Sequence, residues 1–243
     1  MRRIIIALII AITTITISHT LTLECDCDGI TIASWNVQNL GPTKLEDGRA
    51  ERIASHIEDH DIIVIQEITD ASGRAGAYLC ESLPNHACTV SERTGGTRKE
   101  QYLIASRYPI ASPRLLEHEE LERGVYLADI DLGYRTITIA TAHLKPDRVP
   151  SELRILEEIL PQNVILAGDL NSDCRYLPEG TRDYLTRTRW IIPDSADTTP
   201  ARSRCAYDRI VTSTDALELI KGYTIIETPQ GLSDHHVVAL VIA

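Results

Sequence analysis

Residues Asn163–Arg175, NVILAGDLNSDCR, form the stretch from which the rest of this chain can be interpreted. The stretch begins with an apolar run, Val164–Leu166, of residues that favour strands. Three side chains with oxygen atoms follow, on Asp169, Asn171 and Asp173. This pattern predicts a buried strand that carries a polar cluster at its end, where α/β proteins bind ligands. Asp and Asn also form ordinary turns, so the segment alone leaves both interpretations open.

The same arrangement recurs along the chain. Polar residues stand at or beside the ends of four more predicted strands: Asn36 in Ile30–Val37, Glu67 in Ile62–Ile68, His143 at the end of Tyr134–His143, and Asp234 with His235 before the terminal strand. Two further candidates lie in strand-like stretches, Glu100 in EQYLIASRYP and Asp208 in CAYDRIVTS. Five strand ends with functional groups favour one shared site over five unrelated turns.

Two of these residues also have structural interpretations. Burial of the Glu67 carboxylate without a partner would be costly, so its partner is expected to be a metal ion or, alternatively, an arginine. A lone histidine such as His143 is commonly structural. Its position at another strand end, like the other polar residues, is what favours catalysis.

The set of side chains suits metal-assisted hydrolysis of a phosphodiester. A hard cation such as Mg²⁺ prefers carboxylate and water oxygens and stabilises charge on phosphoryl oxygens. One histidine can take a proton from water while the other supports the leaving oxygen. The Cys and His residues lack zinc-finger spacing, and the sequence contains neither a GxSxG elbow nor a Walker-type loop.

The length of 243 residues fits a single domain behind an N-terminal leader. Arg2 and Arg3 precede a short apolar stretch, which predicts a secretory signal over about residues 1–20. An uncleaved membrane anchor is the alternative. A lead segment, residues 21–29, follows, and the folded domain is expected over 30–243.

Export would make the six cysteines disulfide-forming. Proximity in the sequence suggests the pairs Cys80–Cys88 and Cys174–Cys205. For Cys25 and Cys27 in the lead segment, a local disulfide, a partner elsewhere and free thiols all remain open.

The net charge of −11 opposes binding to a polyphosphate at long range. Divalent cations and local arginines would have to supply the attraction. The loop Arg93–Lys99, RTGGTRK, is the one locally basic and flexible patch beyond the leader.

Apolar spacing predicts the remaining elements. Amphipathic helices are expected around residues 50–57 and 153–160, and further helices over 71–83 and 216–220. The clearest hairpin joins Gly124–Asp131 to Tyr134–His143 through the turn LGY, with Ile137 and Ile139 on one face of the second arm.

Several short motifs together resemble the endonuclease/exonuclease/phosphatase superfamily. WNVQNLG, IQE, ATAHL, GDLN and SDH occur in the order of that superfamily. Within it, RKEQYLIA, GDLNSDCRY, WIIPDSADTT and CAYDRIV are similar to segments of the deoxyribonuclease I-like nucleases. The similarity runs from about Ile30 to the C-terminus.

The resemblance implies a four-layer α/β sandwich, in which two mixed β-sheets pack face to face with helices outside. It implies a secreted monomeric endonuclease that cleaves DNA, chiefly double-stranded, to 5′-phosphate products. Mg²⁺ or Mn²⁺ would lie in the site, and Ca²⁺ would support the structure.

The resemblance also assigns residue roles. Glu67 would be the main metal ligand, with Asn36 and Asp234 beside it. His143 paired with Glu100, and His235 paired with Asp208, would be the acid and base in an order left open. The resemblance further implies that Asp169 and Asn171 orient the phosphate and the attacking water, and that Arg123 and Arg98 contact DNA. It also implies a calcium site at Asp197, Thr199 and Ser203, and the Cys174–Cys205 disulfide.

Some positions depart from the family pattern. Thr69 stands where the relatives carry an arginine that enters the minor groove, and Arg98 stands where they carry a tyrosine. The second calcium loop of the family, near LLEHEELERG, is shortened here and lacks its small disulfide. Contact with the minor groove is therefore expected to differ.

Two rival functions are carried forward. A secreted phospholipid phosphodiesterase of sphingomyelinase type would use the same fold but would need apolar or aromatic membrane loops. A non-catalytic binding protein would have lost some of the metal and histidine positions, yet Glu67, His143, Asp169 and His235 are all present.

Overall fold

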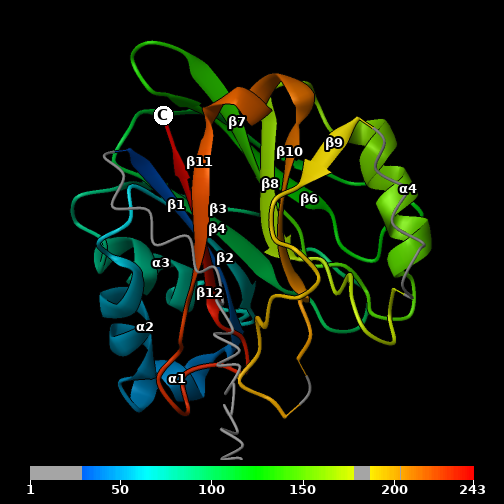
Figure 1. The fold of residues 1–243 in the computed structure, drawn as a ribbon. Helices are drawn as coiled ribbons and strands as arrows, with labels where there is room; N and C mark the ends of the chain where they lie inside the picture. The colour runs from blue at the N-terminus through cyan, green and yellow to red at the C-terminus, as the bar shows by residue number, and fades with distance from the viewer. Residues whose placement is uncertain (1–28, 178–186, 203) are drawn as a thin grey trace, which may run out of the picture.

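The computed structural model describes residues 29–177, 187–202 and 204–243 (Figure 1). The expected leader, both cysteines of the lead segment and Ser203 lie outside the described residues. Within the described ranges, none of the helices has the length and apolar character needed to cross a membrane.

In the described part of the chain, two six-stranded mixed sheets form the centre of the fold (Figure 1). The first has the strand order β11-β12-β1-β2-β4-β3, with bounds β1 Ile30–Leu40, β2 Ile62–Ile68, β3 Ala87–Val90, β4 Gln101–Ser106, β11 Ile220–Ile226 and β12 Val237–Ile242. The second has the order β5-β6-β7-β8-β10-β9, with bounds β5 Ile110–Leu116, β6 Val125–Asp131, β7 Thr136–Thr141, β8 Val164–Asp169, β9 Thr188–Trp190 and β10 Asp208–Ser213. The pairs β1·β2 and β7·β8 are parallel, and their neighbours are antiparallel.

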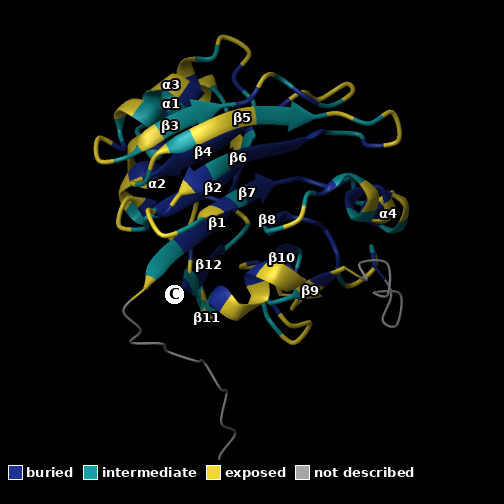
Figure 2. Ribbon diagram, turned by 90° about the horizontal axis from the view of Figure 1, so that it is seen from above, coloured by how far each residue is buried: buried dark blue, intermediate teal, exposed yellow. Residues whose placement is uncertain are grey.

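Helices cover the outer faces of both sheets. Helices α1 (Pro42–Glu46), α2 (Arg49–Ile57) and α3 (Arg74–Glu81) lie on the first sheet, and α4 (Val149–Ile159) lies on the second (Figure 2). The predicted stripe of α2, including Ile53 and Ile57, is fully buried against the first sheet. A separate apolar cluster fills the space between the sheets, where Val64 of β2 and Ile165 of β8 are both buried. The predicted four-layer sandwich is confirmed.

The prediction of local elements was correct where the apolar pattern was regular. The hairpin is confirmed as β6 and β7, with Ile137 and Ile139 buried. Both disulfides expected within the domain, Cys80–Cys88 and Cys174–Cys205, are present.

Other local predictions were wrong or incomplete. Strands β5, β9 and β11 were not predicted, because β5 contains a proline and exposed positions while Gly222 interrupts the apolar pattern of β11. Helix α3 begins at Arg74 instead of Ala71, because Gly73 takes a left-handed conformation just before it. The helix expected over 216–220 is a short 3₁₀ helix, Thr214–Leu219.

Candidate active site

Strand ends from both sheets meet at one edge of the sandwich. The amide Nδ2 of Asn36, on β1, donates to Glu67 Oε1 of β2 at 2.9 Å and to Asp169 Oδ2 of β8 at 3.0 Å. Asn36 therefore joins the polar end of the first sheet to that of the second. His143 follows β7 and forms a β-bridge with Asp169, so it enters the same cluster.

Irregular backbone at the ends of β1 and β2 orients Glu67. The pairing of β1 with β2 shifts register between Asn36 and Leu40, and that of β2 with β4 shifts between Ile65 and Ile68. Glu67 itself has φ +63°, a left-handed conformation that costs a non-glycine residue on the order of 1 kcal/mol or more. A bulge of this kind re-aims a side chain, and here Glu67 Oε2 accepts a hydrogen bond from Asn39 N at 2.8 Å.

The first histidine is held by a buried carboxylate. His143 Nδ1 lies 3.0 Å from Glu100 Oε1, so its N–H donates to Glu100. The other ring nitrogen, Nε2, lies 3.5 Å from Asp169 Oδ2. Glu100 is also bound by Arg123, whose Nε lies 3.1 Å from Glu100 Oε2 and whose Nη1 donates to His143 O at 3.4 Å.

The second histidine is held in the same way from the opposite side. His235 Nδ1 lies 2.9 Å from Asp208 Oδ2, and its Nε2 lies 3.6 Å from Asp169 Oδ2. The His235 carbonyl accepts from Trp35 Nε1 at 3.0 Å and from Thr228 Oγ1 at 2.7 Å, which fixes the backbone. Both histidines therefore direct Nε2 towards the same oxygen of Asp169.

Surrounding carboxylates favour the protonated form of both rings. Burial disfavours the imidazolium of His143, but Glu100 and Asp169 outweigh burial and raise the pKa of His143 to about 9. Burial likewise opposes protonation of His235, while Asp208 and Asp169 raise the pKa of His235 to about 10. The excess of carboxylates over cations is the cause in both cases.

Two of the predicted metal ligands, Asn36 and Glu67, are hydrogen-bonded to each other, and Glu67 Oε1 lies 3.9 Å from His143 Nδ1. Glu67 is held by Asn36 and Asn39 within the described chain, so its partner is not the arginine considered as an alternative. Asp234 is 60% exposed and its Oδ1 lies 3.8 Å from His235 Nε2. Carboxylate oxygens such as those of Glu67 and Asp234 are ligands that a hard divalent cation prefers, so the residues present fit the expected Mg²⁺ or Mn²⁺.

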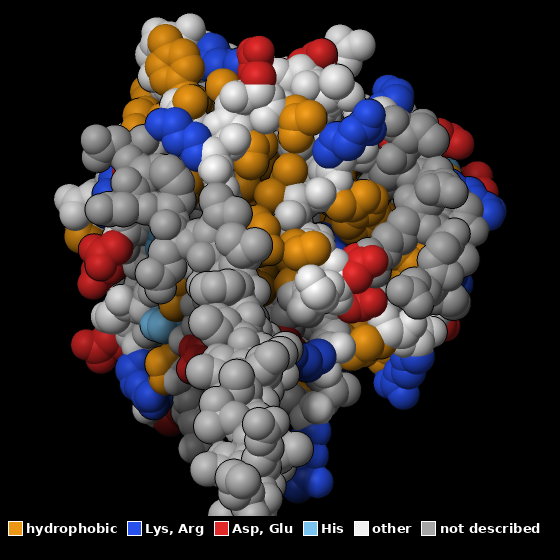
Figure 3. Space-filling model, in the orientation of Figure 1, with side chains coloured by type: hydrophobic (Ala, Val, Ile, Leu, Met, Phe, Trp, Pro, Cys, Tyr) orange, Lys and Arg blue, Asp and Glu red, His pale blue; other side chains and the backbone are white. Residues whose placement is uncertain are grey.

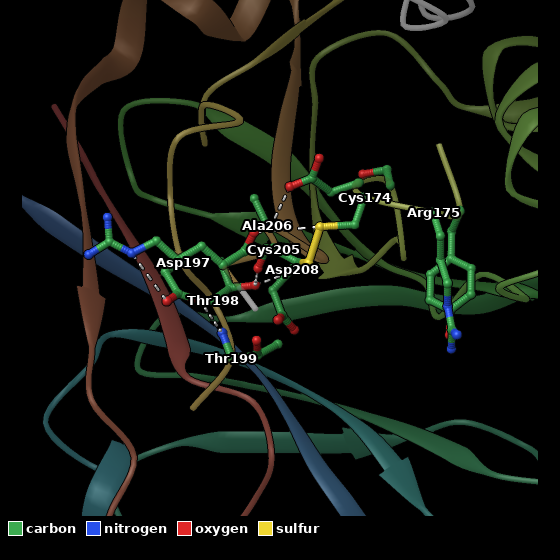
Figure 4. Close-up of a disulfide and its surroundings, with 12 residues drawn as sticks. Cys174, Arg175, Asp197, Thr198, Thr199, Cys205, Ala206 and Asp208 are labelled. Carbon is green, nitrogen blue, oxygen red and sulfur yellow. Dashed lines mark hydrogen bonds and ion pairs between the residues drawn. A yellow bond between two sulfur atoms is a disulfide. The ribbon is translucent and has the colours of Figure 1, made fainter. Parts of the chain in front are cut away.

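Not every polar residue after β8 enters this centre. Asp173 turns away, because its Oδ2 accepts from Ala206 N at 2.7 Å and supports the loop closed by the Cys174–Cys205 disulfide (Figure 4). Of the three polar residues after this strand, Asp173 therefore has a contact that supports the loop. Asn171 stays next to the centre, where its Nδ2 donates to Leu144 O at 3.0 Å.

Two of the expected calcium residues, Asp197 and Thr199, lie near that disulfide (Figure 4). Thr199 N donates to Asp197 Oδ1 at 3.3 Å, and Arg204 Nε lies 4.0 Å from Asp197 Oδ2. This geometry is an Asp turn with a weak ion pair. The calcium site stays a prediction.

A groove lined by four cationic side chains, and also by Glu122 and Asp147, lies beside His143. Arg98 and Arg123, both predicted to contact DNA, line this groove of about 700 Å³ together with Lys145, Arg175 and Tyr176. The Arg175 guanidinium lies 4.7 Å from the Tyr176 ring centroid. Sequence analysis did not select the last three residues. Their position directly after the ATAHL and GDLNSDC motifs was the available signal.

The coloured part of the face shown in Figure 3 carries charges of both signs. Lys and Arg side chains there alternate with Asp and Glu around a patch of hydrophobic side chains. Such a mixed surface provides little long-range attraction for a polyanion. Local clusters of cations must provide it.

Comparisons with known proteins agree with the fold. The model of the Endonuclease/Exonuclease/phosphatase family matches residues 33–235. Among curated proteins, Deoxyribonuclease-1 of Bos taurus is 29% identical over 222 residues, covering 77% of this chain and 78% of that protein. Deoxyribonuclease gamma of Homo sapiens is 29% identical over 215 residues, covering 74% and 70%.

Solved structures show the same fold. A family protein from Leptotrichia buccalis matches with a TM-score of 0.67 at 17% identity, covering 88% of this chain and all of that one. Sphingomyelinase C from Streptomyces griseocarneus matches with a TM-score of 0.65 at 15% identity, covering 89% and 100%. At such identities the likeness concerns the fold alone.

Proposed function

The chain belongs to the endonuclease/exonuclease/phosphatase family and is a DNA-cleaving phosphodiesterase, and we propose that it is a secreted, divalent-metal-dependent endonuclease that acts through two histidines. The observation that carries this proposal is the position of Asp169 Oδ2. His143 Nε2 and His235 Nε2 lie 3.5 and 3.6 Å from this one oxygen, and a separate carboxylate holds the Nδ1 of each ring. Two such imidazoles can serve one phosphate from two sides.

The histidines divide the two proton transfers. The charge of a bound cation would oppose the carboxylates that raise both pKa values, so that one ring can be neutral. The neutral imidazole accepts a proton from the attacking water, and the protonated one donates a proton to the leaving 3′ oxygen, which leaves a 5′-phosphate. Glu100 and Asp208 hold the Nδ1–H of each ring, so Nε2 is the atom that exchanges protons. Asp169 and Asn171 orient the phosphate and the water between the two rings.

Glu67, Asn36 and Asp234 would hold a Mg²⁺ or Mn²⁺ ion. When bound, the ion supplies positive charge to the phosphoryl oxygens. Asn36 Nδ2 keeps Glu67 and Asp169 in a fixed relation, so the oxygens of the site are arranged before substrate binds. A Ca²⁺ ion at Asp197 and Thr199 would support the loop next to Asp208.

The cationic groove would receive the DNA strand. Arg98, Lys145 and Arg175 can each contact a phosphate of double-stranded DNA, and Tyr176 offers a flat face for a sugar. Arg123 would contact the phosphate nearest the site, while it also neutralises Glu100. The two disulfides support a location outside the cytosol, with a leader either cleaved or kept as an anchor.

Plasmid nicking tests the proposal. The purified protein should convert supercoiled plasmid to nicked and linear forms with Mg²⁺ or Mn²⁺ present, and EDTA should stop the reaction. A parallel assay uses sphingomyelin vesicles, and gel filtration reports whether the protein is monomeric. Cleavage of sphingomyelin in place of DNA would favour the phospholipid phosphodiesterase, and no hydrolysis of either substrate would overturn both.

A further inference from the structure

A buried lysine joins two backbone segments that carry residues of the candidate site. Lys44, on α1, is 5% exposed, and its Nζ donates to Val37 O and to Leu232 O, each at 2.7 Å. These two carbonyls are 195 positions apart in the chain. They belong to the end of β1 and to the loop before β12.

Each acceptor adjoins a residue of the site. Val37 follows Asn36, and Leu232 lies three positions before His235. The hydroxyl of Ser233 joins the same two segments, because Ser233 Oγ donates to Asn36 O at 2.6 Å and accepts from His235 N at 3.1 Å. The β1 end and the loop of His235 are therefore held together by the Lys44 ammonium and by Ser233.

Holding two backbone segments together with a buried charged group costs more free energy than doing so with a neutral group. Burial, together with the charge of Arg49, lowers the pKa of Lys44 to about 8, although Asp234, Glu67 and Asp47 partly offset both effects. Burial of a cation against backbone carbonyls is poor evidence for a gain in stability. A long side chain with three donors can instead fix the distance between two segments.

We propose that Lys44 is a positioning residue, which clamps the loop of His235 to the end of β1 so that His235 and the Asn36–Glu67 pair face one phosphate. The clamp rests on the proposed function for its catalytic consequence. Its structural consequence is independent of that function. Loss of the clamp should free residues 232–236 to move relative to β1.

The test uses Lys44→Met, which keeps the length of the side chain but removes its donors, and Lys44→Arg, which keeps them. In Lys44→Met, kcat on plasmid should fall at least tenfold while KM changes less than threefold, and Lys44→Arg should recover part of kcat. Lys221→Met, at an exposed lysine on β11, is the matched control and should cleave as the wild type does.

Hydrogen exchange provides a readout that needs no activity. In Lys44→Met without metal, amides of residues 232–236 should exchange at least tenfold faster, while those around Glu100 and His143 keep wild-type rates. Faster exchange without loss of kcat would leave the clamp intact but contradict its catalytic role. Unchanged exchange at 232–236 in Lys44→Met would overturn the clamp itself. Inactive wild-type protein with the expected exchange pattern would count against the proposed function alone.

Discussion

One oxygen atom connects most of the candidate site. Asp169 Oδ2 accepts from Asn36 and lies within 3.6 Å of the Nε2 atoms of both histidines. Asp169 is 2% exposed, so water cannot screen these interactions effectively. Its negative charge therefore favours protonation of both rings, and its own pKa is lowered by His235 and His143 despite burial. At the scale of single residues, acid and base are coupled through this carboxylate.

Removal of either imidazole should abolish most of the activity. His143→Ala and His235→Ala should each reduce plasmid nicking by about 10² to 10⁴-fold, the usual contribution of a general acid or base. Circular dichroism should show an intact fold. His118→Ala, in the β5–β6 loop, is the control, and its nicking rate should be unchanged. Near wild-type rates for both site variants would contradict the proposed mechanism.

The raised pKa values predict how stability depends on pH when metal is removed. Both histidines have a folded pKa above the ordinary value of 6.5, about 9 for His143 and about 10 for His235. Their contribution is therefore fully present below pH 6.5 and is lost as pH rises to 9 and 10. The shift of His143 alone corresponds to roughly 3 kcal/mol.

Thermal melts in EDTA from pH 6 to pH 10.5 measure this effect. The melting temperature should fall across that range, and His235→Gln should flatten the upper part of the curve. A melting temperature that stays level up to pH 10 would show that the carboxylates do not hold the two rings protonated.

At the scale of elements, the site depends on how closely strand ends approach. A Cβ on Gly168 of β8 would lie 2.2 Å from Ala142 O, immediately before His143. Only glycine lets β8 and the end of β7 run this close. The β-bridge between His143 and Asp169 follows directly after that contact.

Gly168→Ala should therefore separate the two strand ends. The free energy of unfolding should fall by at least 1–3 kcal/mol, because backbone atoms must move to make room for the added Cβ. The nicking rate should fall as well. Chemical denaturation and the plasmid assay measure the two effects. Gly41→Ala is the control, because its Cβ would meet Thr69 Oγ1 at an ordinary 3.4 Å. Equal stability of the two variants would contradict this account.

The two disulfides should differ in their contribution. The Cys174–Cys205 loop spans 31 residues and the Cys80–Cys88 loop spans 8. Loop-closure entropy predicts that the double Ser variant of the longer loop loses about 3.7 kcal/mol and that of the shorter loop about 2.5 kcal/mol. Urea unfolding of both variants measures the difference. The opposite order would indicate that entropy of the unfolded chain does not dominate.

At the scale of the whole molecule, charge works against the substrate. The chain has 24 basic and 35 acidic residues, yet four of the basic side chains line one groove beside His143. Attraction to DNA must then be local and short-ranged, because charges farther away than a Debye length are screened. Binding should depend on those four side chains far more than on net charge.

Salt dependence tests this distribution. A plot of log KM against log salt concentration should lose about one unit of slope for each of Lys145→Ala and Arg175→Ala, since each removes one phosphate contact. The control is Arg52→Ala, on the exposed face of α2, which should leave the slope unchanged. Equal effects of all three variants would place the DNA elsewhere.

The sequence by itself determined the chemistry of the strand ends and most of the layers. Apolar alternation and helical stripes predicted β1, β2, β6, β7, β8 and α2. Burial of one face of a strand or helix makes apolar residues repeat at a fixed spacing, and this spacing is present in the sequence itself. The residue types Asn36, Glu67, His143, Asp169 and His235 were likewise visible. These five residues lie in one cluster, which agrees with the prediction of one shared site at the strand ends.

Only the tertiary structure decided which of these groups contact one another. Asp173 turns towards Ala206, Glu67 is held by Asn36 and Asn39, and Lys44 joins two carbonyls far apart in the chain. Nothing local distinguishes such roles, because they follow from the register between strands and from the way two sheets pack. A one-residue shift in β8 would move Asp169 to the other face. Side-chain partners are thus a property of the assembled sandwich, whereas side-chain chemistry is already present in the chain.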